Sequence, residues 1–564
     1  MDQLLPCRGS SAARRRWCHP AARPSSALAI AGSVAAALLL AVVLFGVRLT
    51  PSGGNHTSWV FDGGRDVLKS GPLATVPDPS DRTLGGLLSP DFNDSSCLSR
   101  YRAMLYRRPS LHAISSHLIS TLRRYESLHR QCGPGTPAYA RAVERLRAAP
   151  NASTTPPSSS SSDCSYLVWN PVEGLGNRIL SITSGFLYAL LTGRVLLLHS
   201  SGGDLDDLFC EPFPGSTWIL SAGDKDDFPI RDMEQLGQGH HESLGAVLGR
   251  GEDPGAASPW LYAHLVHNYD AQDRRFFCDD AQAALRRVPW LVFHSDNYFA
   301  PGLFLIPGEH ERELSRMFPR RDLVFHHLGR YLFHPSNTVW GMAMRYHDEY
   351  FAKADERVGI QVRTFGWAPI SADELYGQIL KCTQRENILP VPNSGEVVAA
   401  NADGGGQPAK RKAVVVVSLH GEYSEKLRET YQKENGSTTA AGREAVSVYQ
   451  PTHLGAQRSG EKEHNQQAFA EMVLLGFSDA VVTTAASTFG YVGQGLAGLR
   501  PWVLMSPVDE KAPDTLCRHA PTIEPCFHSP PNYDCRAKAE GDTGRMVRHI
   551  RHCEDFPQGV QLVE

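Results

Sequence analysis

The sequence predicts an α/β protein built on parallel sheets with helices on both faces. From Cys164 onward, short runs of Val, Leu and Ile alternate with longer stretches of helical periodicity. Continuous apolar runs bounded by polar turns are typical of strands buried on both faces, as in parallel sheets. The six clearest runs are YLVW, RVLLLH, PWLVFHS, RVGIQVR, AVVVVSL and DAVVTT.

The N-terminus predicts a membrane anchor. Residues 27–47 carry no charge, and five arginines precede them against the single acid Asp2. A run of this length crosses a bilayer as a helix, and positive flanks stay in the cytosol. We therefore expect a cytosolic tail (1–26), a signal anchor (27–47) and a lumenal body, with a cleaved signal peptide as the alternative. The net charge of −4 over 564 residues gives no sign of nucleic-acid binding.

Cysteine usage agrees with a lumenal body. Ten of the twelve cysteines follow the predicted anchor. An even number in an oxidising compartment predicts disulfides, whose pairing stays open. Zinc is the alternative, but the chain has no C-x-x-C pair. Cys517, Cys526, Cys535 and Cys553 lie in a loop-rich tail with few apolar anchors, so we expect disulfides to fasten this tail to the body.

Composition divides the lumenal part into three regions. Residues 48–163 are rich in Gly, Pro and Ser, which predicts a stem and linker with a short helical patch. Residues 164–350 and 351–564 each hold several predicted strands. Two segments, 237–257 and 391–412, interrupt the pattern and are expected to be exposed insertions.

The predicted turn NPVEGLGN (170–177) stands between the strand YLVW and a predicted helix, RILSITSGFLYALLTG. A helix that begins after a Gly-rich turn presents free N–H groups and its positive dipole end, where an anion binds. Arg178 adds a cation able to hold phosphate oxygens. The alternative is a strand–helix corner without a ligand. The stretch is not a P-loop, because it lacks the Lys-Ser/Thr ending.

Two later segments favour an anion site. Arg363 falls at the end of the strand in RVGIQVR, and ligands of doubly wound sheets collect at the carboxyl ends of strands. A guanidinium there suits a diphosphate, although it could instead pair with Asp355 or Glu356. After DAVVTT, Ser487 and Thr488 open a second predicted helix, and their hydroxyl and N–H groups can cap the helix or bind phosphate.

Five long motifs follow one another in the chain: GLGNR, HHLGRYLFHPSNTVWG, ADERVGIQVR, STFGYVGQGLAGLRPWVL and EPCFHSPPNYDC…RHCED. Together, from about Cys164 to Asp555, they closely resemble the plant xyloglucan fucosyltransferase family. The resemblance implies a GT-B-like pair of Rossmann-type domains, with the acceptor side in 164–350 and the GDP-fucose side in 351–564. It also implies a type II Golgi membrane enzyme that moves L-fucose from GDP-fucose to a galactose of a cell-wall glycan, xyloglucan or an arabinogalactan side chain. The linkage would be α1,2, formed with inversion and without a metal or other cofactor.

The resemblance also places the site. Arg363 is expected to neutralise the charge that develops on the leaving GDP, and Arg363 and Arg178 with the helix N-termini are expected to take the place of a metal on the diphosphate. The nearest imitation of a metal-binding D-x-D is Asp204, Asp206 and Asp207, which we interpret as a loop or helix cap. The predicted GDP-fucose contacts are Gly174, Gly176, Asn177, Arg178, Gln361, His464, Ser487, Thr488, Phe489 and Gly490.

Asp296 is the candidate for the group that takes the acceptor proton. It follows the apolar run WLVF, so it lies near the carboxyl end of a strand. It could instead cap the next turn, as Asp-Asn commonly does, and His294 is a rival on the same face of the strand. A strongly dissociative reaction, with charge held mainly by GDP, would need no strong base.

Two other functions stay open at this point. A non-catalytic glycan-binding scaffold of the same fold would keep the sheet cores but lose Arg363 or the Ser-Thr turn, and this chain has both. A transferase that uses another nucleotide sugar is harder to separate, because GDP and UDP share the diphosphate. The sequence also leaves a homodimer open.

Overall fold

A computed structural model describes residues 81–93, 95–148, 164–200, 205–220, 228–392, 410–432, 437–439 and 442–564. All of them belong to one compact unit, Ala74–Glu564. The predicted anchor, residues 27–47, lies outside the described residues. Within the described ranges, no helix is both long enough and apolar enough to span a membrane.

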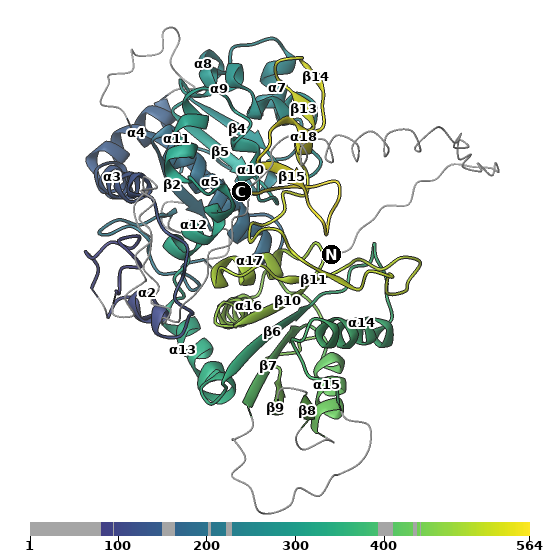
Figure 1. The fold of residues 1–564 in the computed structure, drawn as a ribbon. Helices are drawn as coiled ribbons and strands as arrows, with labels where there is room; N and C mark the ends of the chain where they lie inside the picture. Colours follow the sequence, from purple (N-terminus) through teal and green to yellow (C-terminus); the bar gives the residue numbers. More distant parts are fainter. Residues whose placement is uncertain are drawn as a thin grey trace, which may run out of the picture. The chain divides into compact units, whose positions relative to one another are not determined.

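The first half is organised around a five-stranded parallel sheet (Figure 1). Its central strand, β1 (Ser165–Asn170), pairs with β2 (Arg194–His199) on one side and β5 (Trp290–His294) on the other. The outer strands are β3 (Ile219–Leu220) and β4 (Trp260–His264). β2 is buried along its whole length, as the apolar run RVLLLH predicts.

The second half holds a seven-stranded sheet in the order β12-β11-β10-β6-β7-β9-β8. Its five inner strands are parallel, and their order is that of a Rossmann sheet. The two outer strands, β8 and β12, run antiparallel. All six strands predicted from apolar runs are confirmed across the two sheets. The strands here are β6 (Glu356–Val362), β7 (Lys410–Ser418), β8 (Ser437–Thr439), β9 (Gly442–Tyr449), β10 (Ala480–Thr484), β11 (Trp502–Leu504) and β12 (Cys517–His519).

Helices cover both faces of each sheet. On β1, Leu167 and Trp169 belong to one buried cluster with the helix α5 (Leu175–Thr192), while Tyr166 and Val168 belong to another with α4 (Pro137–Ala148). This alternation is the two-residue period of a strand. In the second half, Figure 1 shows α16 (Lys462–Leu475) and α17 (Thr488–Ala497) on one side of the sheet, and α14 (Ala372–Arg385) and α15 (Glu422–Gln432) on the other. The predicted α/β fold with parallel sheets is therefore confirmed.

Shorter elements complete the unit. The remaining helices are α2 (Leu98–Arg102), α3 (Ser116–Cys132), α7 (Leu244–Gly249), α8 (Pro254–Ala257), α9 (Asp279–Leu285), α10 (Ala300–Leu303), α11 (Glu309–Met317), α12 (Val324–Leu332), α13 (Asn337–Tyr346) and α18 (Thr543–Met546). Two small antiparallel pairs lie in the C-terminal tail: β13 (Tyr533–Asp534) with β14 (Ala539–Glu540), and β15 (Ile550–His552) with β16 (Val560–Leu562).

Folded structure begins well before residue 164. Residues 81–148, expected to belong to a stem and linker, contain α2, α3 and α4. Leu118 and Leu122 of α3 are fully buried and belong to the same core as α5. The overall composition of 48–163 therefore does not reveal the packed helical segment, because the apolar residues of this segment are few, although they are regularly spaced.

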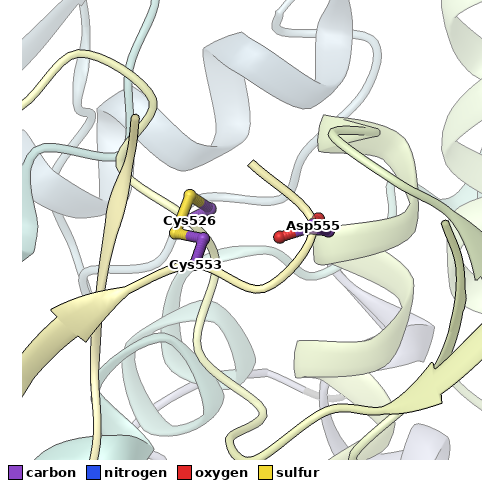
Figure 2. A group of neighbouring side chains, drawn as sticks. All are labelled: Cys526, Cys553 and Asp555. Carbon is purple, nitrogen blue, oxygen red and sulfur yellow. A yellow bond between two sulfur atoms is a disulfide. The ribbon is translucent and has the colours of Figure 1, made fainter. Parts of the chain in front are cut away.

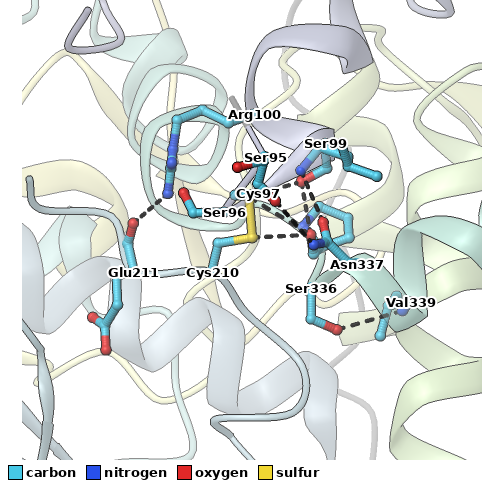
Figure 3. The surroundings of a disulfide bond; sticks show 12 residues. Ser95, Ser96, Cys97, Ser99, Arg100, Cys210, Glu211, Ser336, Asn337 and Val339 are labelled. Atoms are coloured by element: carbon cyan, nitrogen blue, oxygen red, sulfur yellow. Dashed lines mark hydrogen bonds between the residues drawn. A yellow bond between two sulfur atoms is a disulfide. The ribbon is translucent and has the colours of Figure 1, made fainter. Parts of the chain in front are cut away.

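Two disulfides tie this segment to the first sheet region. Cys97 bonds to Cys210, and Figure 3 shows Arg100 beside this disulfide, donating a hydrogen bond to the carbonyl of Glu211. The second disulfide joins Cys132, at the end of α3, to Cys164, just before β1. Both disulfides reduce the conformational entropy of the unfolded chain and so stabilise the packed segment.

The expected disulfides are confirmed, and all ten cysteines after the predicted anchor are paired. Two of these bonds fasten the tail to the body, Cys382–Cys517 and Cys278–Cys535. The fifth, Cys526–Cys553, closes a loop within the tail.

Two local predictions differ from the structure. Residues 237–257 are not a simple exposed loop, because they contain α7 and α8, and Leu244 and Val247 are buried. In the other predicted insertion, residues 393–409 lie outside the described residues, while Lys410–Ser418 is strand β7 with Lys412 buried. A helical face with only two buried apolar residues is too short a pattern to recognise from sequence.

Candidate active site

The helices α5 and α17 begin in the same way. Each follows a non-glycine residue in the left-handed conformation, Glu173 (φ 62°) before α5 and Ala486 (φ 57°) before α17. The next residue caps the helix: Gly174 for α5 and Ser487 for α17, whose Oγ accepts a hydrogen bond from Gly490 N at 3.5 Å. Left-handed backbone at non-glycine residues concentrates at functional sites. The predicted Ser cap is confirmed, whereas α5 begins at Leu175, inside the stretch expected to be a turn.

The first turns of these two helices touch. A Cβ on Gly176 would lie 2.7 Å from Thr488 Oγ1 and 2.9 Å from Phe489 N, so only glycine fits there. Thr488 Oγ1 donates a hydrogen bond to Asn177 Oδ1 at 3.0 Å, and Asn177 Nδ2 donates to the carbonyl of Asp296 at 2.9 Å. Asn177 therefore connects the two halves at the point where two positive helix ends meet.

A cavity of about 470 Å³ opens at this junction. This volume suits a small-molecule ligand. Residues of both halves and of the C-terminal tail contribute to its lining. Every predicted site residue except Arg178 and Gly490 lies in the lining, namely Gly174, Gly176, Asn177, Asp296, Gln361, Arg363, His464, Ser487, Thr488 and Phe489.

Arg178 and Gly490 adjoin lining residues but are not part of the lining. Arg178 donates from Nε to the carbonyl of Glu173 at 3.0 Å, which reinforces the turn before α5. A Cβ on Gly490 would lie 3.0 Å from Gln361 Oε1 and from Thr483 Cβ. Gly490 therefore lets α17 approach the strands beneath it.

Arg363 occupies the carboxyl end of β6, as predicted. Its backbone N donates to Thr484 Oγ1 at 2.9 Å, and its Nη2 donates to Gln457 Oε1 at 3.1 Å. Asp355 and Glu356 pair with basic residues of β7 at the opposite end of the strand. Gln457 thus holds the guanidinium at the cavity, while Asp355 and Glu356 are paired elsewhere.

Asp296 forms a pair with a histidine that the sequence did not single out. Its Oδ2 lies 2.5 Å from His267 Nδ1, and its Oδ1 accepts hydrogen bonds from His267 N at 3.1 Å and Asn297 Nδ2 at 2.5 Å. The carboxylate is 9% exposed, whereas the imidazole is 65% exposed and lines the cavity. The hydrogen bond to Asp296 raises the pKa of His267.

His267 and Asp296 meet because β4 and β5 are neighbouring parallel strands. His264 pairs with His294 at the ends of these strands, so the residues that follow each strand lie side by side. The rival His294 does not line the cavity, and its Nδ1 lies 3.2 Å from the carbonyl of Leu236. The signal that could have found His267 is the run WLYAH, which forms β4 and ends three residues before it.

Three polar atoms at the cavity have no hydrogen-bond partner among the described residues: Gln361 Oε1, His464 Nδ1 and Gln467 Oε1. Burial lowers the pKa of His464, which favours the neutral imidazole. Leaving buried polar atoms unpaired costs free energy, which a polar ligand can recover. The chemistry of the lining therefore suits a ligand rich in hydrogen-bonding groups.

The C-terminal tail closes part of the cavity. Figure 2 shows the disulfide Cys526–Cys553 with Asp555 close to it. These three side chains are the one group with metal-ligand spacing in the described ranges, but both sulfurs belong to the disulfide and offer no thiolate. The loop that the disulfide closes carries His528 and Ser529 to the cavity, and Phe556, just after this loop, also lines it.

Asp555 supports the turn before α17. Its Oδ2 accepts hydrogen bonds from Ala486 N at 3.0 Å and from Tyr491 OH at 2.5 Å. Tyr491 OH also lies 3.2 Å from Nε2 of His528, whose pKa is lowered by burial. A tail carboxylate thus holds the left-handed Ala486 in place beneath the Ser487–Thr488 turn.

The acidic run before β3 lies apart from this cavity. Asp207 forms an ion pair with Lys462 at 2.6 Å, and Asp206 contributes to a separate small hollow. Asp204 lies outside the described residues. The two described aspartates therefore lie in a loop outside the cavity lining, which agrees with the interpretation of this acidic run as a loop or helix cap.

Two Rossmann-like halves with a cavity between their helix ends are the arrangement of an α/β protein that binds a nucleotide-containing ligand. The chain belongs to the xyloglucan fucosyltransferase family, whose match covers residues 58–536. This match begins upstream of Cys164 and takes in the helical segment with α2, α3 and α4.

Proteins of similar sequence and structure support this family membership. The chain is 46% identical to a galactoside 2-alpha-L-fucosyltransferase of Arabidopsis thaliana over 500 residues, 88% of this chain and 86% of the relative. It is also 46% identical to a pea (Pisum sativum) protein of the same name over 499 residues, 88% of this chain and 85% of the relative. Among solved structures, an Arabidopsis thaliana FUT1 mutant in complex with GDP matches 86% of this chain and 100% of its own, with a TM-score of 0.77.

Proposed function

We propose that this glycosyltransferase moves L-fucose from GDP-fucose to a galactose of a cell-wall glycan, xyloglucan or an arabinogalactan side chain, in α1,2 linkage. The observation that carries the proposal is the junction of α5 and α17, where two helix N-termini and Arg363 face one cavity. The relatives named above support fucose as the transferred sugar, and the FUT1 structure with GDP supports a guanine nucleotide.

The diphosphate of the donor would lie against the helix ends. Backbone N–H groups at a helix N-terminus bind phosphate oxygens, and the dipoles of α5 and α17 both favour negative charge there. Arg363 supplies the full positive charge, and its planar fork fits two phosphate oxygens. Fixed positive charge of this kind stabilises the leaving GDP, which supports a metal-independent reaction.

The His267–Asp296 pair would take the acceptor proton. The acceptor hydroxyl oxygen attacks the anomeric carbon of fucose, and the bond from that carbon to the β-phosphate oxygen breaks with its electron pair left on GDP. The hydroxyl proton passes to His267 Nε2, because Asp296 holds the other ring nitrogen protonated. One displacement of this kind inverts the anomeric configuration. Asp296 thus becomes the residue that orients the base.

The location of the enzyme forms part of the proposal. Residues 27–47 would anchor the chain in the Golgi membrane as a type II protein, with the tail 1–26 in the cytosol. The five disulfides support a body in an oxidising lumen. Protease treatment of sealed Golgi vesicles should leave the body intact and remove only the tail, whereas digestion of the body would contradict this topology.

A donor and acceptor panel tests the activity. The full chain in detergent is incubated with labelled GDP-fucose, GDP-mannose or UDP-galactose, and with galactosylated xyloglucan or arabinogalactan. We expect transfer only from GDP-fucose, release of the label by an α1,2-specific fucosidase, and activity that survives EDTA. Glycan binding without GDP release would contradict an enzyme, and faster transfer from UDP-galactose would contradict the donor.

A further inference from the structure

A pair of stacked aromatic side chains stands at the mouth of the cavity. Phe365 and Trp367 follow Arg363 in the loop after β6, and both line the cavity. Their ring centroids lie 5.1 Å apart, with an angle of 25° between the planes. Trp367 is 61% exposed, and no other aromatic side chain in the described ranges is among the exposed large hydrophobic residues.

The loop holds this pair in a defined position. Ala368 N donates to the carbonyl of Phe365 at 3.1 Å, which closes a tight turn around Gly366 and Trp367. On the donor side, the guanidinium carbon of Arg363 lies 5.8 Å from the centre of the Phe365 ring. The aromatic surface is therefore continuous with the group that would hold the diphosphate.

We propose that Phe365 and Trp367 form a sugar-stacking subsite for the acceptor glycan, beyond the galactose that receives fucose. The subsite rests on the proposed fucosyl transfer. A pyranose ring has a face of C–H groups that packs on an aromatic ring and an edge of hydroxyl groups that stays in water. A half-exposed indole offers both environments at once.

The position of Trp367 favours the glycan over the guanine base. A base needs an enclosed pocket with hydrogen-bonding groups, and the buried Gln361 Oε1 and His464 Nδ1 supply such groups deeper in the lining. A cavity of about 470 Å³ encloses one small ligand, so a polymeric acceptor must extend over the rim. Trp367 lies on that rim, where successive sugar rings would pass.

The test is the effect of Trp367→Ala on three Michaelis constants of the full chain. For a galactosylated xyloglucan oligosaccharide we expect KM to rise about tenfold or more, as loss of one aromatic contact implies. KM for GDP-fucose and KM for phenyl β-galactoside should not change, because neither reaches the rim. Trp367→Phe should retain most of the oligosaccharide affinity. Val391→Ala, at an equally exposed apolar side chain outside the lining, is the matched control.

Two results would overturn the subsite: a raised KM for GDP-fucose, which would assign Trp367 to the base, or an unchanged KM for the oligosaccharide. Direct binding separates this proposal from the proposed activity. Saturation-transfer NMR of the oligosaccharide with wild type and Trp367→Ala reports stacking even if no fucose is transferred. A wild-type chain that binds the glycan through Trp367 but transfers no fucose would refute the activity alone, and equal binding by both proteins would refute the subsite.

Discussion

Thr488 Oγ1 donates a hydrogen bond to Asn177 Oδ1 at 3.0 Å, and this contact joins the first turns of α17 and α5. The two helices come from different halves, and their positive ends meet only because Gly176 leaves room for Thr488. The contact therefore fixes the spacing of the two ends that would share the diphosphate.

Thr488→Val keeps the shape of the side chain and removes the donor. The loss of one hydrogen bond should lower the free energy of unfolding by about 1 kcal/mol. Because the two helix ends lose their register, kcat/KM for GDP-fucose should fall about tenfold, a change of about 1.4 kcal/mol in transition-state binding. Thr383→Val is the matched control, since Thr383 donates within α14 and lies outside the cavity lining. Equal kinetic losses in both variants would refute a special role for the contact.

The His267–Asp296 pair predicts a pH dependence. Asp296 raises the pKa of His267 above the usual 6.5, so the basic form is lost as pH falls through a value higher than 6.5. The acidic limb of kcat/KM should therefore lie above pH 6.5 in the wild type. Asp296→Asn removes the cause of the raised pKa, so the limb should move to lower pH while kcat at pH 8 falls.

His267→Ala should abolish this limb and lower kcat about 100-fold or more, within the range of general base catalysis, with the Kd for GDP unchanged. An unchanged kcat in His267→Ala would show that GDP departure alone drives the reaction. Such a result would favour the dissociative alternative, in which no strong base is needed.

Loss of the tail disulfide should weaken both the stability of the protein and its binding of GDP-fucose. Cys526→Ala/Cys553→Ala opens a loop of sequence separation 27 and should lower the free energy of unfolding by about 2–4 kcal/mol. KM for GDP-fucose should also rise, because Asp555 no longer supports the turn at Ala486. Cys132→Ala/Cys164→Ala opens a loop of similar separation, 32, away from the cavity, and should lower stability without changing that KM. Equal KM values for GDP-fucose in the two double variants would contradict a role of the tail disulfide in donor binding.

The sequence predicted the sheets well and parts of the site poorly, for physical reasons. The six apolar runs are buried parallel strands, and burial on both faces leaves an unmistakable pattern. Arg363 was found because its position at a strand end follows from the same pattern. The start of α5 was misplaced, because Gly174 and Gly176 have the composition of a turn while Gly176 serves close helix contact.

His267 could not be found in this way. It is exposed, it follows a short strand, and 29 residues separate it from Asp296. Only the pairing of β4 with β5 brings the two together. The disulfide partners had the same difficulty, since Cys278 and Cys535 are 257 residues apart in sequence.

The turnover of Arg363 variants with GDP-fucose and a galactosylated acceptor tests the central claim most directly. If fixed positive charge at the end of β6 stabilises the leaving GDP, Arg363→Ala should lower kcat about 100-fold or more, and Arg363→Lys should restore little of it. Arg287→Ala, which removes an exposed arginine paired with Asp253 outside the cavity lining, should keep wild-type turnover. A folded Arg363→Ala protein that transfers fucose at the wild-type rate would contradict the account.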